Sequence, residues 1–313
     1  MEASNLGHFI SIYEKFAQAE NKSERTVEAV TAAARKFDRF LGGNTNAQDI
    51  TADDLRKYIL YLQECCKWSD HPTIKKNHDG LSSNTIAHHV RHIKSFWSWM
   101  YGEKFLEHNP LAQVRTPQET LKLVTPLTSG DVTQLIKVIP RDNNKDYRNA
   151  CVTITLYGTI LRISELLGLP LANVDFTNGQ IKVLGKGAKE RSVFMSPKVY
   201  KPLFKYYSKW RPKVTSDYFF IHEDGRKLTR FYFEHRMQAY VRKANLTKPC
   251  TPHLLRYSGA IQLLRNGCDP YTLQQILGHS TMEMTRRYLK IANSDIEKSL
   301  KTFSPAEQVD IRF

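Results

Sequence analysis

The sequence predicts a mainly α protein with two domains, a helical N-terminal domain and a mixed α/β domain that is mostly helical and carries a small antiparallel β-sheet. Three observations support this prediction. Apolar residues recur three or four positions apart along most of the chain, one β-prone hairpin interrupts that pattern, and a proline-containing stretch divides it. The 313 residues are enough for two domains of ordinary size.

The N-terminal domain is placed at residues 1–115. A helix is predicted over residues 25–41, because its apolar side chains form one stripe, and Thr51 can cap the helix that follows. Pro, Gly and charged residues break the pattern over residues 67–81, which are predicted to be a loop. A longer helix is predicted from about residue 84 to residue 101.

The second domain is placed at residues 127–313, after a linker at residues 116–126 that lacks apolar periodicity. Residues 180–184 and 191–195 are β-prone and flank a Gly-rich turn, which predicts a hairpin. Helices are predicted around this hairpin, over residues 129–139, 147–161, 197–210, 229–244, 252–266, 270–277 and 281–291.

The charge of the chain indicates a polyanionic partner, either nucleic acid or an anionic membrane. The formal net charge is +15, and the whole excess lies beyond residue 120, since residues 1–120 hold equal numbers of basic and acidic side chains. No apolar run is long enough for a transmembrane helix, and no basic amphipathic helix has a large apolar face, so a membrane partner is not expected. The five cysteines are odd in number and lack CxxC spacing, which predicts a reduced, cytoplasmic protein.

The helix predicted over residues 84–101 has a polar face made by Asn84, His88, Arg91 and Ser95. Asn and Arg are suited to base edges and phosphates, so this face is a candidate DNA-binding surface. An ordinary solvated face would have the same pattern, so the sequence allows either a DNA-binding face or a solvated one. His88 lies four residues before another histidine, but no third ligand is in view, so no metal site is predicted.

Two segments of the second domain carry basic side chains in positions that suggest a specific role. Arg162 lies inside an apolar run near a turn between two helices, so it pairs with an acid such as Glu165 or awaits an anion. Lys186 and Lys189 lie at the tip of the hairpin, where they either keep the surface soluble or deliver an ammonium group into a groove.

Two further segments combine a helix terminus with polar side chains. Thr251 is a natural N-cap, which puts His253 and Arg256 in the first turn, where backbone N–H groups favour an anion such as phosphate. Gly278 can end a helix directly before His279. Tyr288 lies in the next helix, where a lone tyrosine is structural by default.

The order Arg, Lys, His-x-x-Arg, Gly-His and Tyr resembles the catalytic signature of the tyrosine recombinases, the Xer-like and phage-type integrases. The stretches LRISELLGL, GKGAKER, HLLR and LQQILGHSTMEMTRRYLK carry this resemblance, which covers essentially the whole chain. It implies that the catalytic residues are Arg162, Lys186 (or else Lys189), His253, Arg256, His279 and Tyr288.

The resemblance also implies a core-binding domain at residues 1–115 and a catalytic domain at residues 127–313. Two positions depart from the family pattern. Ile160 stands where the family often has Gly, and Tyr257 stands where His is more usual. Neither is a catalytic position, so both bear on local packing.

The implied function is site-specific recombination of double-stranded DNA, as in the integrases and transposases of mobile elements, with no metal, ATP or other cofactor. Tyr288 would attack the scissile phosphate and form a covalent 3′-phosphotyrosine, and strand exchange would pass through a Holliday junction. Arg162 and Arg256 would stabilise the phosphoryl charge, because each guanidinium can donate two parallel hydrogen bonds.

The remaining implied roles concern protons and assembly. His253 would accept the tyrosine proton, Lys186 would protonate the leaving 5′ oxygen, and His279 would hydrogen-bond the phosphate. A short C-terminal helix, with Leu300 and Phe303 on its apolar side, would dock on a neighbouring protomer in a homotetramer on two DNA sites, or else fold back onto its own domain.

The sequence leaves two alternatives open. A type IB topoisomerase or telomere resolvase would share the chemistry, and a DNA-binding or excision factor would retain the scaffold without catalysis. The complete set of Arg, Lys, His and Tyr residues argues against the second alternative.

Overall fold

The computed structural model describes residues 5–67, 77–120, 124–185 and 190–292. The chain divides into two compact units, Met1–Leu123 and Val124–Phe313. The first unit is helical, and the second is mostly helical with a three-stranded antiparallel sheet. The predicted fold class is therefore confirmed. No helix among the described residues is long and apolar enough to cross a membrane.

The first unit is a helical bundle built around α4. Its core is aromatic, because Phe37 and Tyr58 pack with Trp97 and Phe96 of α4, all of them inaccessible to solvent or nearly so. Side-chain caps start the helices at the residues where the apolar stripes begin, as Thr51 does for α3. The helices are α1 (Leu6–Ala19), α2 (Glu24–Phe40), α3 (Ala52–Glu64) and α4 (Ser83–Gly102).

The prediction that residues 67–81 are entirely loop was wrong at both ends of that segment. Strand β1 (Cys66–Lys67) pairs with β2 (Asn77–Gly80) in an antiparallel ladder. The sequence of β2 is NHDG, which has no apolar alternation, so periodicity could not reveal it. The pairing depends on the partner strand rather than on the local sequence.

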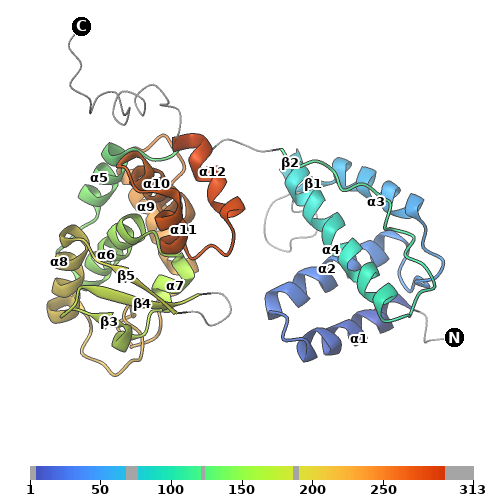
Figure 1. Cartoon of the computed structure of the whole chain (residues 1–313), viewed down its shortest axis with the longest axis horizontal. Helices are drawn as coiled ribbons and strands as arrows, with labels where there is room; N and C mark the ends of the chain where they lie inside the picture. Colours follow the sequence, from blue (N-terminus) through green and yellow to red (C-terminus); the bar gives the residue numbers. More distant parts are fainter. Residues whose placement is uncertain (1–4, 68–76, 121–123, 186–189, 293–313) are drawn as a thin grey trace, which may run out of the picture. The chain divides into compact units, whose positions relative to one another are not determined.

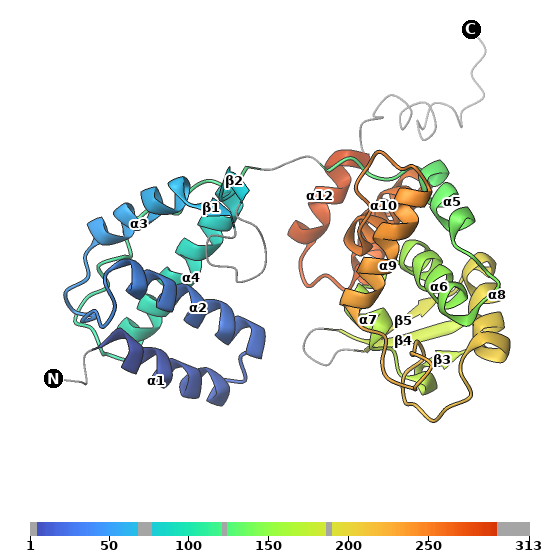
Figure 2. The same ribbon diagram turned by 180° about the vertical axis from the view of Figure 1, so that it is seen from behind.

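The second unit places its helices beside a small sheet (Figure 1). α10 lies among α6, α11 and α12, and the sheet lies at the edge of the unit in both views (Figure 2). The helices are α5 (Ser129–Val138), α6 (Asn144–Thr159), α7 (Ile163–Leu167), α8 (Pro197–Lys205), α9 (Arg230–Lys243), α10 (Pro252–Arg265), α11 (Pro270–Leu277) and α12 (Met282–Ala292), with a 3-10 turn η2 (Leu171–Asn173) and a π-helical turn η3 (Tyr206–Trp210).

The predicted hairpin is present as β4 (Gln180–Leu184) and β5 (Glu190–Phe194), and β3 (Val174–Asp175), which was not predicted, adds a third strand to the sheet. In the register Val183 lies opposite Arg191 and Ile181 lies opposite Val193, so these four residues share one face of the hairpin. The three apolar members of this face are buried, and Arg191 is the one charged residue among them.

Close backbone packing holds α10 against the end of α6. A Cβ added at Gly259 would lie 2.3 Å from the carbonyl oxygen of Tyr157, so only glycine fits at this crossing. The chain then leaves α6 through Ile160, whose φ of 50° is left-handed. A glycine would adopt this conformation without strain, which explains why the family often has glycine where this chain has Ile160.

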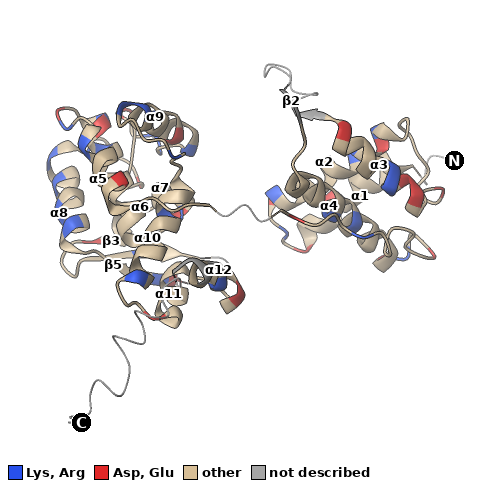
Figure 3. Ribbon diagram, turned by 90° about the horizontal axis from the view of Figure 1, so that it is seen from above, with Lys and Arg blue, Asp and Glu red and all other residues tan. Residues whose placement is uncertain are grey.

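Basic residues are distributed differently in the two units, as Figure 3 shows. α3 of the first unit carries Asp53, Asp54, Arg56 and Lys57 side by side, whereas α8 of the second unit carries lysines and no acidic residue. Because residues 1–120 carry no net charge, nearly all of the excess positive charge belongs to the second unit.

Candidate active site

Arg162 lies at the turn between α6 and α7, two residues after the left-handed Ile160. Its backbone N–H donates to Oε2 of Glu165 at 2.8 Å, and its Nη1 donates to Oε1 of the same carboxylate at 2.9 Å. Glu165 thus caps α7 and orients the Arg162 side chain, so the pairing with Glu165, one of the two explanations that the sequence left open, is present. The Arg162 side chain is about one third exposed, so part of its guanidinium faces solvent.

Arg256 lies in the first turns of α10, which Thr251 and Pro252 start as predicted. Its side chain is 7% exposed, and its Nη2 donates to the carbonyl oxygen of Leu277 at 3.0 Å. Nη1 has no hydrogen-bond partner among the described residues, and its distance from Oε2 of Glu165 is 3.9 Å. Burial and the charge of Arg162 lower the pKa of Arg256 to about 10.

His253 lies three residues before Arg256 on α10 and is exposed. Partial desolvation of the imidazole, together with the positive charges of Arg230 and Arg256, lowers its pKa below the ordinary value. The ring is therefore neutral near pH 7 and can accept a proton.

His279 follows Gly278, which ends α11 as predicted and adopts a left-handed conformation. Its Nδ1 lies 3.1 Å from Oγ1 of Thr285, a fully buried residue of α12. Burial and the charges of Arg256 and Arg162 lower the pKa of His279 to about 4. The imidazole is neutral at physiological pH, and Thr285 fixes the orientation of its ring.

Tyr288 lies on α12 and is 8% exposed. Its ring is 6.0 Å from the His279 ring and 5.3 Å from the Tyr257 ring, measured between centroids, and it packs over a small apolar cluster that includes Ile160. The two departures from the family pattern, Ile160 and Tyr257, thus both support the position of Tyr288.

The structure brings five of the six predicted catalytic residues into one region of the second unit. They lie on the α6–α7 turn, on α10, after α11 and on α12, although as many as 126 positions separate them in the sequence. The sixth, Lys186, and its alternative Lys189 lie outside the described residues. The structure describes the two strands that flank them, β4 and β5.

Two further residues, which were not predicted from the sequence, complete this region. Arg191 of β5 donates to both carboxylate oxygens of Glu165, at 3.0 and 2.8 Å, and Thr285 contacts His279. A signal for Arg191 existed, because it alternates with the apolar residues Val193 and Met195 and therefore points to the buried face of a predicted strand. The sequence holds no comparable signal for Thr285.

The four candidate DNA-binding residues lie together on α4 of the first unit. His88, Arg91 and Ser95 are exposed, whereas Asn84 is half-buried. Arg91 forms an ion pair with Glu119, and Thr120 bonds with Ser83, so residues 119–120 lie along the first turns of this helix. Glu119 therefore offsets part of the positive charge on this face.

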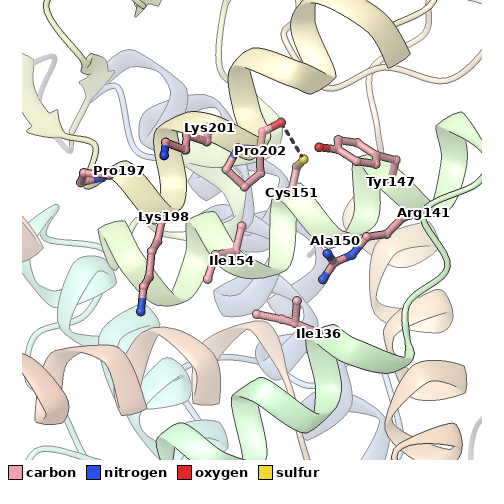
Figure 4. A pocket seen from close by; sticks show the side chains of 10 residues that line it. All are labelled: Ile136, Arg141, Tyr147, Ala150, Cys151, Ile154, Pro197, Lys198, Lys201 and Pro202. Carbon is pink, nitrogen blue, oxygen red and sulfur yellow. Dashed lines mark hydrogen bonds between the residues drawn. The ribbon is translucent and has the colours of Figure 1, made fainter.

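A separate cavity of about 430 Å³ lies between α5, α6 and α8 (Figure 4). Its lining includes Ile154 and Cys151 of α6, and the Cys151 thiol donates to the carbonyl of Pro202. Lys198 and Lys201 of α8 also line it. None of the predicted catalytic residues lines it, so it is not part of the candidate active site. Within the described part of the chain no group of three or more His, Cys, Asp or Glu residues could hold a metal ion.

Solved structures of DNA-processing enzymes share this fold. The integrase of the Tn1549 transposon, in complex with a circular intermediate DNA, has a TM-score of 0.70 at 21% identity, and the match covers 90% of this chain and 94% of that one. A lambda integrase dimer bound to a core site has a TM-score of 0.70 at 13% identity, with 91% and 95% covered.

Sequence relatives and family models agree with the structural match. The tyrosine recombinase XerD of Staphylococcus saprophyticus is 32% identical over 302 residues, covering 95% of this chain and 98% of the relative. XerD of Staphylococcus haemolyticus is 32% identical over 265 residues, covering 80% and 90%. These relatives are recombinases, which does not favour the topoisomerase or telomere resolvase alternative.

Residues 126–294 match the phage integrase family, and residues 8–116 match the phage integrase SAM-like domain. Each match lies within one of the two units that the structure separates. The chain therefore belongs to the phage integrase family and is a site-specific tyrosine recombinase.

Proposed function

We propose that this recombinase cleaves one DNA strand at a time through Tyr288 and rejoins it to a different strand, so that recombination passes through a Holliday junction. The observation that carries the proposal is the Nη1 atom of Arg256, a buried guanidinium nitrogen without a hydrogen-bond partner among the described residues. A buried cationic donor without a hydrogen bond is costly, and a phosphate oxygen would satisfy it.

The charges around this atom suit a phosphodiester. Arg162 and Arg256 present guanidinium groups to the same region. Glu165 hydrogen-bonds Arg162 and lies 3.9 Å from Arg256, and no other carboxylate of the described structure forms an ion pair with either of them. Two guanidinium groups can donate to the non-bridging oxygens of a phosphate, whose negative charge grows as the nucleophile attacks.

The covalent step is a transfer of the phosphoryl group to tyrosine. The Tyr288 oxygen forms a bond to phosphorus, the bond from phosphorus to the 5′ oxygen breaks, and the product is a 3′-phosphotyrosine with a free 5′ hydroxyl. His253 takes the phenol proton, and a proton from Lys186 neutralises the leaving oxygen. Attack by a 5′ hydroxyl from another strand reverses the step, so the bond energy is retained and neither ATP nor a metal ion is required.

His279 serves as a neutral hydrogen-bond donor to the phosphate. With its pKa lowered to about 4, the ring carries one proton at pH 7. When the Thr285 hydroxyl donates to Nδ1, that proton is on Nε2 and can be donated to a phosphate oxygen.

The first unit supplies DNA contacts through α4, where His88, Arg91 and Ser95 are exposed. The solved structures with the same fold that carry DNA support a DNA-binding role for this chain. We further propose a homotetramer on two DNA sites, joined through the C-terminal segment; the predicted helix lies outside the described residues. The sequence-based prediction of a cytoplasmic location fits a protein that acts on DNA.

A suicide-substrate assay tests the proposal. Nicked duplex DNA carrying the recognition site is mixed with the wild type and with Tyr288→Phe, which removes one hydroxyl and keeps the ring that packs against Tyr257. The wild type is expected to give a protein–DNA adduct that survives SDS, and Tyr288→Phe is expected to give none while still binding DNA. An adduct of equal yield from Tyr288→Phe would overturn the assignment of the nucleophile.

A further inference from the structure

Glu165 is a buried carboxylate that faces three arginines from different parts of the second unit. Its side chain is 9% exposed, and it forms ion pairs with Arg162, Arg191 and Arg256. Two of these pairs are hydrogen-bonded, at 2.9 and 2.8 Å, whereas the pair with Arg256 is 3.9 Å long. The carboxylate therefore bonds two of the arginines and leaves the third unbonded.

The hydrogen-bonding capacity of the carboxylate explains this division. A carboxylate has about four acceptor positions. Oε1 accepts from Nη1 of Arg162 and Nη1 of Arg191, and Oε2 accepts from Nη2 of Arg191 and the backbone N–H of Arg162. All four positions are used, and two of them are used by Arg191 alone.

Three elements fix the side chain of Arg191. It starts on the buried face of β5, its Nε donates to the carbonyl oxygen of Ile276 at the end of α11, and its guanidinium lies against Gly278. The side chain is 14% exposed. It is thus held on Glu165 and is not free to turn toward a substrate.

We infer that Arg191 is a positioning residue for the DNA cleavage reaction, because it fills the acceptor positions of Glu165 and so leaves Nη1 of Arg256 available to the phosphate. Without Arg191, two acceptor positions of Glu165 become free beside a buried cation. Arg256 then closes the gap of 3.9 Å, and the phosphate must compete with a buried ion pair for the same donor. This inference rests on the proposed role of Arg256 in binding the phosphate.

The test compares Arg191→Met with the double variant Arg191→Met/Glu165→Gln in the suicide-substrate assay. Arg191→Met removes the guanidinium and retains an aliphatic chain of similar length. It is expected to bind DNA as the wild type does but to form the adduct about tenfold to a hundredfold more slowly. Glu165→Gln removes the charge that would capture Arg256, so the double variant is expected to recover part of the rate. A residue that only stabilises the fold would show no such rescue, because the second substitution removes further hydrogen bonds.

Arg211→Met is the matched structural control. Arg211 is a partly buried arginine of the same unit that donates to the carbonyl oxygens of Phe219, Ser216 and Tyr218. It is expected to lower the melting temperature without slowing adduct formation by the folded protein. An Arg191→Met variant that forms the adduct as fast as the wild type, or a double variant no faster than Arg191→Met, would overturn the inference.

A second measurement separates this inference from the proposed function. Inorganic phosphate is titrated into DNA-free protein and followed by NMR, which requires no cleavage. Arg191→Met is expected to weaken phosphate binding and the double variant to restore part of it, even if Tyr288 is not the nucleophile. Equal phosphate affinity in all three proteins would overturn the positioning role, whereas an adduct that is absent from the wild type would overturn only the proposed function.

Discussion

The guanidinium of Arg191 lies directly against the Cα of Gly278. A Cβ added at Gly278 would meet Nη1, Cζ and Nε of Arg191 at 3.1, 3.2 and 3.3 Å, and the φ of Gly278 is 65°. Glycine is therefore needed here for two reasons, the left-handed conformation and the space for the guanidinium. In the Gly-His pair of the sequence motif, Gly278 therefore contacts Arg191, and His279 faces the candidate active site.

Gly278→Ala is expected to lower both stability and activity. The left-handed conformation costs an alanine about 1–2 kcal/mol, and the displaced guanidinium adds to this. Gly267→Ala is the matched control, because Gly267 has a φ of 95° and no atom within 4 Å of an added Cβ. Thermal unfolding should show a larger loss for Gly278→Ala, and only that variant should slow adduct formation. Equal effects of the two substitutions would mean that the contact with Arg191 is unimportant.

Arg256→Ala is expected to bind DNA and to form the adduct roughly 100-fold to 1,000-fold more slowly, the range seen when a single stabilising donor is removed from an active site. Arg256→Lys should recover little, since an ammonium group cannot reach both Leu277 and a phosphate. The measurements are a gel-shift assay and the rate of adduct formation. A parallel loss of binding and cleavage would make Arg256 a DNA-binding residue only.

His279 makes stability depend on pH in a defined window. Its pKa in the folded protein is about 4, below the ordinary value near 6.5, so the unfolded chain binds the proton more readily between these two values. The free energy of unfolding should therefore fall as the pH decreases from about 6.5 to about 4. Urea unfolding of the wild type and of His279→Gln should show a smaller fall for the variant, and identical pH profiles would contradict the lowered pKa.

Ile160 combines strain with burial. A φ of 50° is unfavourable for a β-branched residue such as Ile160. Its side chain is nevertheless fully buried, in the apolar cluster that includes Tyr288. Ile160→Ala keeps the strain and loses the packing, at a cost of about 2–5 kcal/mol. Ile160→Gly loses one more carbon but relieves about 1–2 kcal/mol of strain, so it should be as stable as the alanine variant or more stable. Chemical denaturation that places the glycine variant clearly below the alanine variant would refute this account.

Arg91→Ala tests the DNA-binding role of α4. If Arg91 exchanges Glu119 for a DNA phosphate, its removal should weaken binding of all sequences similarly and reduce the slope of log affinity against log salt by about 1. Arg56→Ala is the control, since Arg56 is also an exposed, ion-paired arginine of the first unit, on α3. Binding titrations at several salt concentrations provide the comparison, and equal salt slopes for the two variants would argue against a contact through Arg91.

Much of the fold was predictable because it depends on local patterns. The apolar stripes predicted α2 and α4 to within about one or two residues, and the predicted caps Thr51 and Thr251 begin helices at the positions where their hydroxyl groups accept backbone N–H groups. Strands β1, β2 and β3 escaped prediction, because two to four residues carry no periodicity and pair only with a partner that the fold supplies.

The sequence by itself determined the residue types of the active site and their order, since the Arg, Lys, His, Arg, His and Tyr pattern can be read without coordinates. Only the tertiary structure decided how these groups share their charges. Which of Arg162, Arg191 and Arg256 is bonded to Glu165 depends on distances of 2.8 to 3.9 Å between residues that lie up to 91 positions apart in the chain. It also depends on the limited number of acceptor positions of one buried carboxylate. A sequence pattern identifies which groups can carry charge, whereas hydrogen bonding in a desolvated site determines which of them remain free for the substrate.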